Sequence, residues 1–143
     1  MNDLSVSQQK FLKALELCQS LVALQRQPSE VPCQAIELFC EVAKEPFVLL
    51  RLSEQYTAEI QKAIVGIYEY AGSVDNWKVG DCPFGVKDHC NILNFFLNVH
   101  TKKFDFFRGK DFTPEMICEF LQDWKGINLT VLLRENSPVL VSD

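Results

Sequence analysis

The sequence predicts an all-α protein, folded as a compact single domain of five to seven helices. First, the 143 residues are enough chain for one domain. Second, apolar residues make up 48% and charged residues 23%, as in soluble globular proteins, and this excludes a disordered chain. Third, apolar side chains recur at helical spacing between residues that typically begin and end helices. Within the single domain 1–143, we expect residues 1–6 and 135–143 to be flexible tails.

The first predicted helix runs from about Ser7 to Gln25. Ser5 and Gln8 have the spacing of a capping box, in which the side chain of each residue accepts a hydrogen bond from the free backbone N–H of the other residue. Its apolar face consists of Phe11, Leu15, Cys18 and Val22. Pro28 then ends this helix.

The second predicted helix covers Glu30 to Lys44, with Ser29 as its N-cap and Pro32 in its first turn. Its inward positions are Ile36, Phe39, Cys40 and Ala43, flanked by Ala35, Leu38 and Val42. Because so little of its surface is polar, we expect this helix to lie at the centre of the core.

Two further segments are predicted before the long loop that begins at Gly72. Phe47–Leu52 is predicted as a short buried helix or connector, although so short an apolar run is also compatible with a strand. Thr57 caps a clear helix that extends to Ala71 and ends at Gly72. The inward face of that helix is predicted from Ile60, Ala63, Ile64, Ile67, Tyr68 and Ala71.

The last helices follow a long loop, Gly72–Val86. A helix is predicted from Asp88 to His100, with Ile92, Leu93, Phe96 and Val99 facing inward. Thr113 and Pro114 begin the final clear helix, and Gly126 ends it. In the tail, Ile127–Asp143, alternating apolar residues are compatible with a strand or with one more helical turn.

Charge, cysteine content and hydropathy narrow the classes of function. The net charge of −5 argues against a general nucleic-acid binder, which needs a basic face, and against an anionic membrane surface. No apolar run exceeds four residues, and the N-terminal residues do not resemble a signal peptide. We therefore expect a cytoplasmic or nuclear protein whose six cysteines are reduced thiols.

Cysteine and histidine are the first candidates for metal ligands or for a catalytic dyad. Cys82, His89, Cys90 and His100 could supply metal ligands, but Cys90 and His100 would lie about 15 Å apart along a helix. His89 and Cys90 are neighbours whose side chains point about 100° apart, so they cannot form a catalytic dyad. Cys82 could still pair with either histidine. We expect no metal, no cofactor and no catalytic residues.

A carboxylate pair and a basic segment are the other candidates. Glu37 and Glu41 are one helical turn apart, which is typical of a solvated face as well as of acid–base catalysis. Thr101–Phe112 interleaves basic and aromatic residues, a pattern typical of single-strand binding but also of an amphipathic helix packed on the core. The candidate partner-binding residues are Trp77, Phe84, Lys102, Lys103, Phe106, Arg108 and Lys110.

The favoured function is a non-enzymatic intracellular protein–protein interaction module. Small regulatory or adaptor proteins, including virus- or pathogen-encoded proteins that bind a host factor, have this size and acidity. One alternative is an RNA- or single-strand-binding protein that uses Thr101–Phe112. A second is a small Cys/His metal protein or enzyme. Because eleven Phe and two Trp crowd so short a chain, we also expect apolar groups at the surface and a homodimer.

Overall fold

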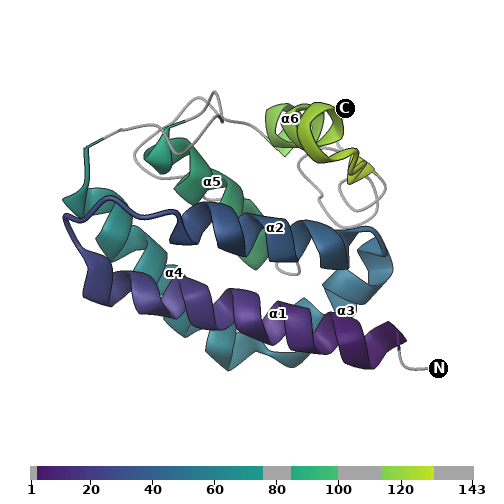
Figure 1. Ribbon diagram of the computed structural model, residues 1–143. Helices are drawn as coiled ribbons and strands as arrows, with labels where there is room; N and C mark the ends of the chain where they lie inside the picture. Colours follow the sequence, from purple (N-terminus) through teal and green to yellow (C-terminus); the bar gives the residue numbers. More distant parts are fainter. Residues whose placement is uncertain (1–2, 76–84, 100–113, 131–143) are drawn as a thin grey trace.

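The computed structural model describes residues 3–75, 85–99 and 114–130. These residues form α-helices and one short 3-10 helix with no strand among them, which confirms the all-α prediction (Figure 1). The elements are α1 (Asp3–Ser20), the 3-10 helix η1 (Leu21–Leu24), α2 (Val31–Ala43), α3 (Pro46–Gln55), α4 (Thr57–Ser73), α5 (Val86–Leu97) and α6 (Pro114–Lys125).

Helix α5 is the central helix of the bundle. Its residues from His89 to Leu97 are all buried, and α2, α4 and α6 pack around it. Helices α1 and α2 lie side by side, and α1 also packs against α4 (Figure 1). The second helix, expected at the centre of the core, packs against α1, α3 and α5 and exposes Glu37 and Glu41 on its polar side, whereas α5 has no exposed residue.

Aromatic rings join three helices through the core. Phe11 of α1 meets Phe39 of α2 edge to face, with ring centroids 5.7 Å apart. Phe39 also stacks on Phe96 of α5, with ring centroids 5.2 Å apart. All three side chains are fully buried. Such pairs add about 0.5–1.5 kcal/mol beyond the burial of their area, so this row fixes α1 and α2 on α5.

Helices α1 and α4 approach each other closely at Gly66. A Cβ atom at this position would lie 2.6 Å from the carbonyl oxygen of Cys18, so only glycine fits without a shift of backbone. The side-chain amide of Gln19 donates to the backbone oxygen of Glu59 at 3.2 Å, on the same helix–helix contact. This contact fixes which face of α4 points inward.

Helix starts differ from the predictions at the N-terminal end of the chain. Helix α1 begins at Asp3, inside the range expected to be a tail, so Ser5 lies within the helix and the predicted capping box is wrong. At α2, Ser29 Oγ accepts a hydrogen bond from the Val31 N–H at 3.0 Å, although Glu30 occupies the N-cap position. Pro46 begins α3, and the predicted short helix after it is confirmed.

Three side chains predicted to face inward are exposed. Val22 is 43% exposed because the chain changes at Leu21 to a 3-10 helix, which turns about 120° per residue and moves the apolar face. Phe47 is 53% exposed at the start of α3. On α4, Tyr68 is 38% exposed, and Tyr70 is the buried tyrosine.

Helix α6 ends as predicted. Gly126 has a φ of 71°, the left-handed conformation that glycine adopts at no steric cost. Its N–H donates to the Gln122 carbonyl at 3.1 Å, and the Ile127 N–H donates to the Leu121 carbonyl at 3.2 Å. These two bonds satisfy carbonyl groups that the end of the helix would leave free.

Candidate functional site

The residues proposed from the sequence as a partner-binding site lie outside the described part of the chain. They are Trp77, Phe84, Lys102, Lys103, Phe106, Arg108 and Lys110. The same holds for Cys82 and His100, the two outer members of the Cys/His set, and for the whole of Thr101–Phe112.

His89 and Cys90 are buried at the start of α5. The Nδ1 atom of His89 lies 2.8 Å from the Gly85 carbonyl oxygen, so Nδ1 carries the hydrogen and donates it. Its Nε2 atom makes no hydrogen bond within the described residues, and the imidazole ring meets Trp124 edge to face at 6.4 Å. Burial is the main cause that lowers the pKa of His89, and the imidazole is therefore neutral in the folded protein.

The state of His89 predicts a loss of stability in acid. In the unfolded chain its pKa returns to about 6.5, so below this pH the unfolded state binds a proton that the folded state does not. The free energy of unfolding should then fall by up to about 1.4 kcal/mol for each further pH unit, until the folded-state pKa is reached. Urea unfolding at about pH 7.5 and about pH 5.5 measures this loss, which should be smaller in His89→Gln. An equal loss in both proteins would contradict it.

The buried thiols are protonated at neutral pH. Burial raises the pKa of Cys90 and of Cys118 to about 12, and that of Cys40 to about 12 as well. Burial also raises the pKa of Cys18, and the nearby Cys90 adds to this effect. Since a thiolate is the nucleophilic form, these four cysteines act as small apolar side chains. Within the described residues, no three His, Cys, Asp or Glu side chains gather where they could hold a metal ion.

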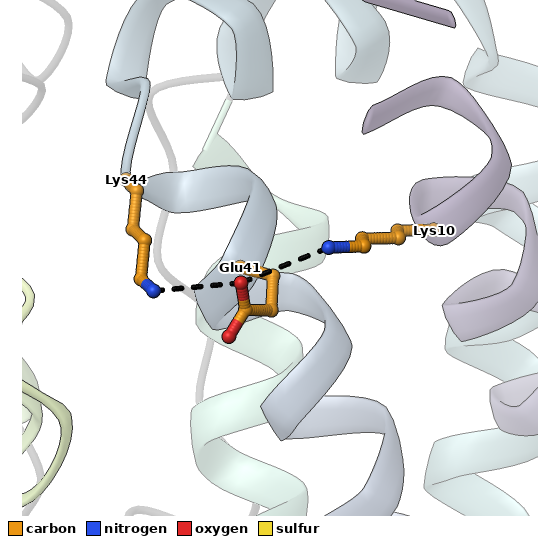
Figure 2. Close-up of polar contacts among 3 residues, drawn as sticks. All are labelled: Lys10, Glu41 and Lys44. Atoms are coloured by element: carbon orange, nitrogen blue, oxygen red, sulfur yellow. Dashed lines mark ion pairs between the residues drawn. The ribbon is translucent and has the colours of Figure 1, made fainter. Parts of the chain in front are cut away.

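Glu37 and Glu41 are exposed and form ion pairs. Glu41 Oε1 lies 3.7 Å from Lys10 Nζ of α1 and 3.4 Å from Lys44 Nζ, and Figure 2 shows its carboxylate between the two lysines. Glu37 Oε2 lies 3.3 Å from Lys125 Nζ of α6. Surface pairs of this kind are worth about 0–1 kcal/mol each. They link α2 to α1 and α6, as expected for a solvated face.

The outer face of α4 is an uncharged surface that sequence reasoning did not identify. We define it by five exposed residues: Ala58, Gln61, Val65, Tyr68 and Gly72. Val65 is 53% exposed and Tyr68 is 38% exposed, one turn apart on the same helix. The other large exposed apolar side chains of the described residues are spread over other elements: Val6, Leu12, Val22, Phe47 and Met116.

Charged and apolar side chains border the outer face of α4 on its two sides. Lys62 and Glu69 are exposed along one edge, and half-buried Ile64 lies along the other. Glu69 Oε1 accepts a hydrogen bond from the side-chain amide of Gln25 at 2.9 Å. Lys62 forms no ion pair within the described part of the chain.

The sequence does contain a signal for this surface. Its residues are spaced by three, four, three and four positions, which is the spacing of one continuous helix face. The inward face of α4 has the same periodicity and is far more apolar, so it hides the weaker pattern. Comparison with protein-family models, with curated proteins and with solved structures finds no match for this chain. In the described residues, no helix has the length and hydropathy to cross a membrane.

Proposed function

We propose that this protein is a non-enzymatic protein–protein interaction module that presents the outer face of α4 to a protein partner. The observation that carries the proposal is the exposure of Val65 and Tyr68 on a helix whose inward face is already complete. That inward face buries Ile60, Ala63, Ile67 and Tyr70 in the core. Val65 is more than half exposed and therefore does little for the fold. Exposed apolar groups that lie together commonly mark interfaces.

The chemistry of the outer face of α4 suits protein recognition. Tyrosine is enriched at interfaces because it buries a large ring with few rotatable bonds and keeps a polar group at its end. The face has no charge to desolvate, and Lys62 and Glu69 supply a polar rim on one side. We place this module in the cytoplasm as a regulatory or adaptor protein. The thiols of the five described cysteines would stay reduced there.

Affinity capture from a nuclease-treated cytoplasmic extract tests the function. Wild-type protein should retain protein partners after nuclease treatment, and Val65→Asp/Tyr68→Ala should lose them. Phe47→Asp is the matched control, because Phe47 is also 53% exposed but lies on α3. Circular dichroism should show that all three proteins are folded.

Two outcomes would contradict the proposal. Equal capture by wild type and by the α4 variant would move the interaction to another surface. Loss of all partners on nuclease treatment would favour the alternative in which Thr101–Phe112 binds RNA.

A further inference from the structure

We propose that the contact between α5 and α6 is an acid-sensitive switch, in which protonation of His89 releases α6 from the rest of the bundle. This inference is independent of the proposed function, because it concerns a different part of the fold from the outer face of α4. It adds a condition, acidity, under which the described fold changes, and it names the helix that moves.

The ring of His89 is part of the contact between α5 and α6. Its side chain is fully buried, and the imidazole meets the Trp124 ring of α6 edge to face, with centroids 6.4 Å apart. Nδ1 donates to the Gly85 carbonyl oxygen at 2.8 Å, which fixes the ring against the first turn of α5. Nε2 is buried and makes no hydrogen bond to a described residue. A neutral imidazole tolerates this arrangement, because its Nε2 carries no hydrogen.

Protonation changes what Nε2 requires. The imidazolium has a hydrogen on each nitrogen, so Nε2 becomes a buried donor that shares a positive charge. A buried donor without an acceptor costs about 1–3 kcal/mol, and a charged one costs more. Since no described residue accepts from Nε2, the imidazolium gains its missing hydrogen bond when solvent reaches the ring.

The surrounding groups compensate little for a charge on His89. On α5, the Asp88 carboxylate favours the protonated ring, but burial outweighs it and lowers the pKa of His89. On α6, Lys125 Nζ lies 4.2 Å from the centroid of the Trp124 ring, and on α2, Glu37 is paired with Lys125 at 3.3 Å. Among the described residues, no charged group of α4 shifts the pKa of His89. The buried titratable groups of these four helices are neutral, because burial raises the pKa of each to about 12: Cys40, Tyr70, Cys90 and Cys118.

Helix α6 is the element whose movement breaks the fewest packing contacts. Helices α1, α2 and α4 are joined through α1, whereas α5 is the main neighbour of α6 among the described helices (Figure 1). The Lys125–Glu37 ion pair links α6 to α2, and exposed pairs contribute about 0–1 kcal/mol. Trp124 itself is only half-buried. Movement of α6 therefore brings solvent to His89 while the packing of α1 on α2 and α4 stays intact.

The pKa of His89 sets the direction of the response. When α6 has moved away, the ring is in water and its pKa is near the ordinary value of about 6.5. With α6 in place, burial holds the pKa lower. Below about pH 6.5 the open state therefore binds a proton that the closed state does not, and opening becomes more favourable by up to about tenfold for each pH unit.

Thiol labelling with a pyridyl disulfide tests the switch, because Cys118 lies on α6 and Cys18 lies on α1. Both thiols are free and buried. Helix α6 has 12 residues, a length that is marginally stable in water without packing, so its release exposes Cys118. Each labelling rate is divided by the rate of the same cysteine in urea-unfolded protein at the same pH. From about pH 7.5 to about pH 5.5, this relative rate should rise up to about tenfold at Cys118.

Urea separates the release of α6 from unfolding of the whole chain. A local opening exposes little surface, so low urea concentrations should hardly change the labelling of Cys118. The same urea should accelerate the labelling of Cys18 strongly, because Cys18 reacts only when the core opens. If both cysteines respond equally to urea at about pH 5.5, global unfolding exposes Cys118 and the switch is overturned.

Two variants assign the response to its group. His89→Gln keeps a polar side chain that takes up no proton, so the relative rate at Cys118 should change less than about twofold between the two pH values. Glu37→Gln removes the ion pair to α6 and keeps His89. It should raise labelling of Cys118 up to about fivefold at both pH values and retain the response to acid.

The pH at which labelling begins to rise provides a test that needs no variant. An acid response in His89→Gln as large as in wild type would assign the response to another group and overturn the switch. If His89→Gln does not fold, the wild-type profile decides. A rise that begins below about pH 6.5 supports His89, whereas a rise that begins only below about pH 5, where carboxylates take up protons, would refute it.

Discussion

Substitution of Gly66 by alanine should destabilise the protein by about 2 kcal/mol or more, although alanine is the better helix former. The new Cβ would lie 2.6 Å from the Cys18 carbonyl oxygen and 3.4 Å from the Gln19 Cα atom. Both are backbone atoms, so no side-chain rotation can relieve the contact. Helices α1 and α4 would have to move apart, and every apolar contact between them would weaken.

Gly72→Ala is the matched control for this prediction. Gly72 is in the same helix, and its Cβ would meet nothing within 4 Å. Alanine there should raise the free energy of unfolding by roughly 0.5 kcal/mol through the lower entropy of the unfolded chain. Thermal unfolding of the two variants at low protein concentration measures both effects. Each kcal/mol should shift the midpoint temperature by about 2–4 °C. Equal midpoints for Gly66→Ala and Gly72→Ala would contradict the close approach of α1 and α4.

The helices themselves could be predicted from the sequence because their apolar residues repeat at helical spacing. The four residues assigned to the inward face of the fifth helix, Ile92, Leu93, Phe96 and Val99, are all buried. That α5 is buried on its other sides could not be predicted. Asn91 and Asn94 interrupt its apolar pattern, yet both are buried, and the Asn98 side chain donates to Asn94 Oδ1 at 2.9 Å. Periodicity assigns such amides to the solvent side.

The choice between Tyr68 and Tyr70 shows a second limit of periodicity. Two residues separated by two positions on a helix point about 200° apart, so only one tyrosine can face the core. The 3.6-residue pattern favours Tyr68, but the structure buries Tyr70. Its hydroxyl donates to the Gln27 carbonyl at 2.6 Å, an acceptor 43 residues away in the chain. A buried tyrosine needs such a partner, and local sequence cannot reveal it.

The candidate site depended on information that helical periodicity does not contain. The sequence drew attention to aromatic residues in predicted loops, such as Trp77 and Phe84, which lie outside the described residues. Val65 does not belong to the inward face predicted for its helix, and nothing in the sequence says whether another element covers the opposite side. Only the packing of α1 and α5 on the other faces of α4 shows that the described fold leaves it exposed.

Substitution of Phe39 by alanine should have the largest effect of any single change considered, a loss of about 3–5 kcal/mol. Phe39 is fully buried and contacts both Phe11 and Phe96. Its removal would leave a cavity between α1, α2 and α5, and Phe11 and Phe96 would each lose one aromatic contact. Because native stability is typically about 5–15 kcal/mol, this variant could be mostly unfolded.

Phe39→Leu keeps the test measurable, since it retains much of the apolar volume and should cost clearly less than alanine. Phe47→Ala is the control, because that ring is 53% exposed and its loss should change stability by no more than about 0.5 kcal/mol. Urea unfolding of the four proteins should therefore rank wild type and Phe47→Ala together, then Phe39→Leu, then Phe39→Ala. If Phe47→Ala lowered the free energy of unfolding as much as Phe39→Ala does, Phe39 would not be more deeply buried than Phe47. The aromatic row would then not be the contact that joins three helices.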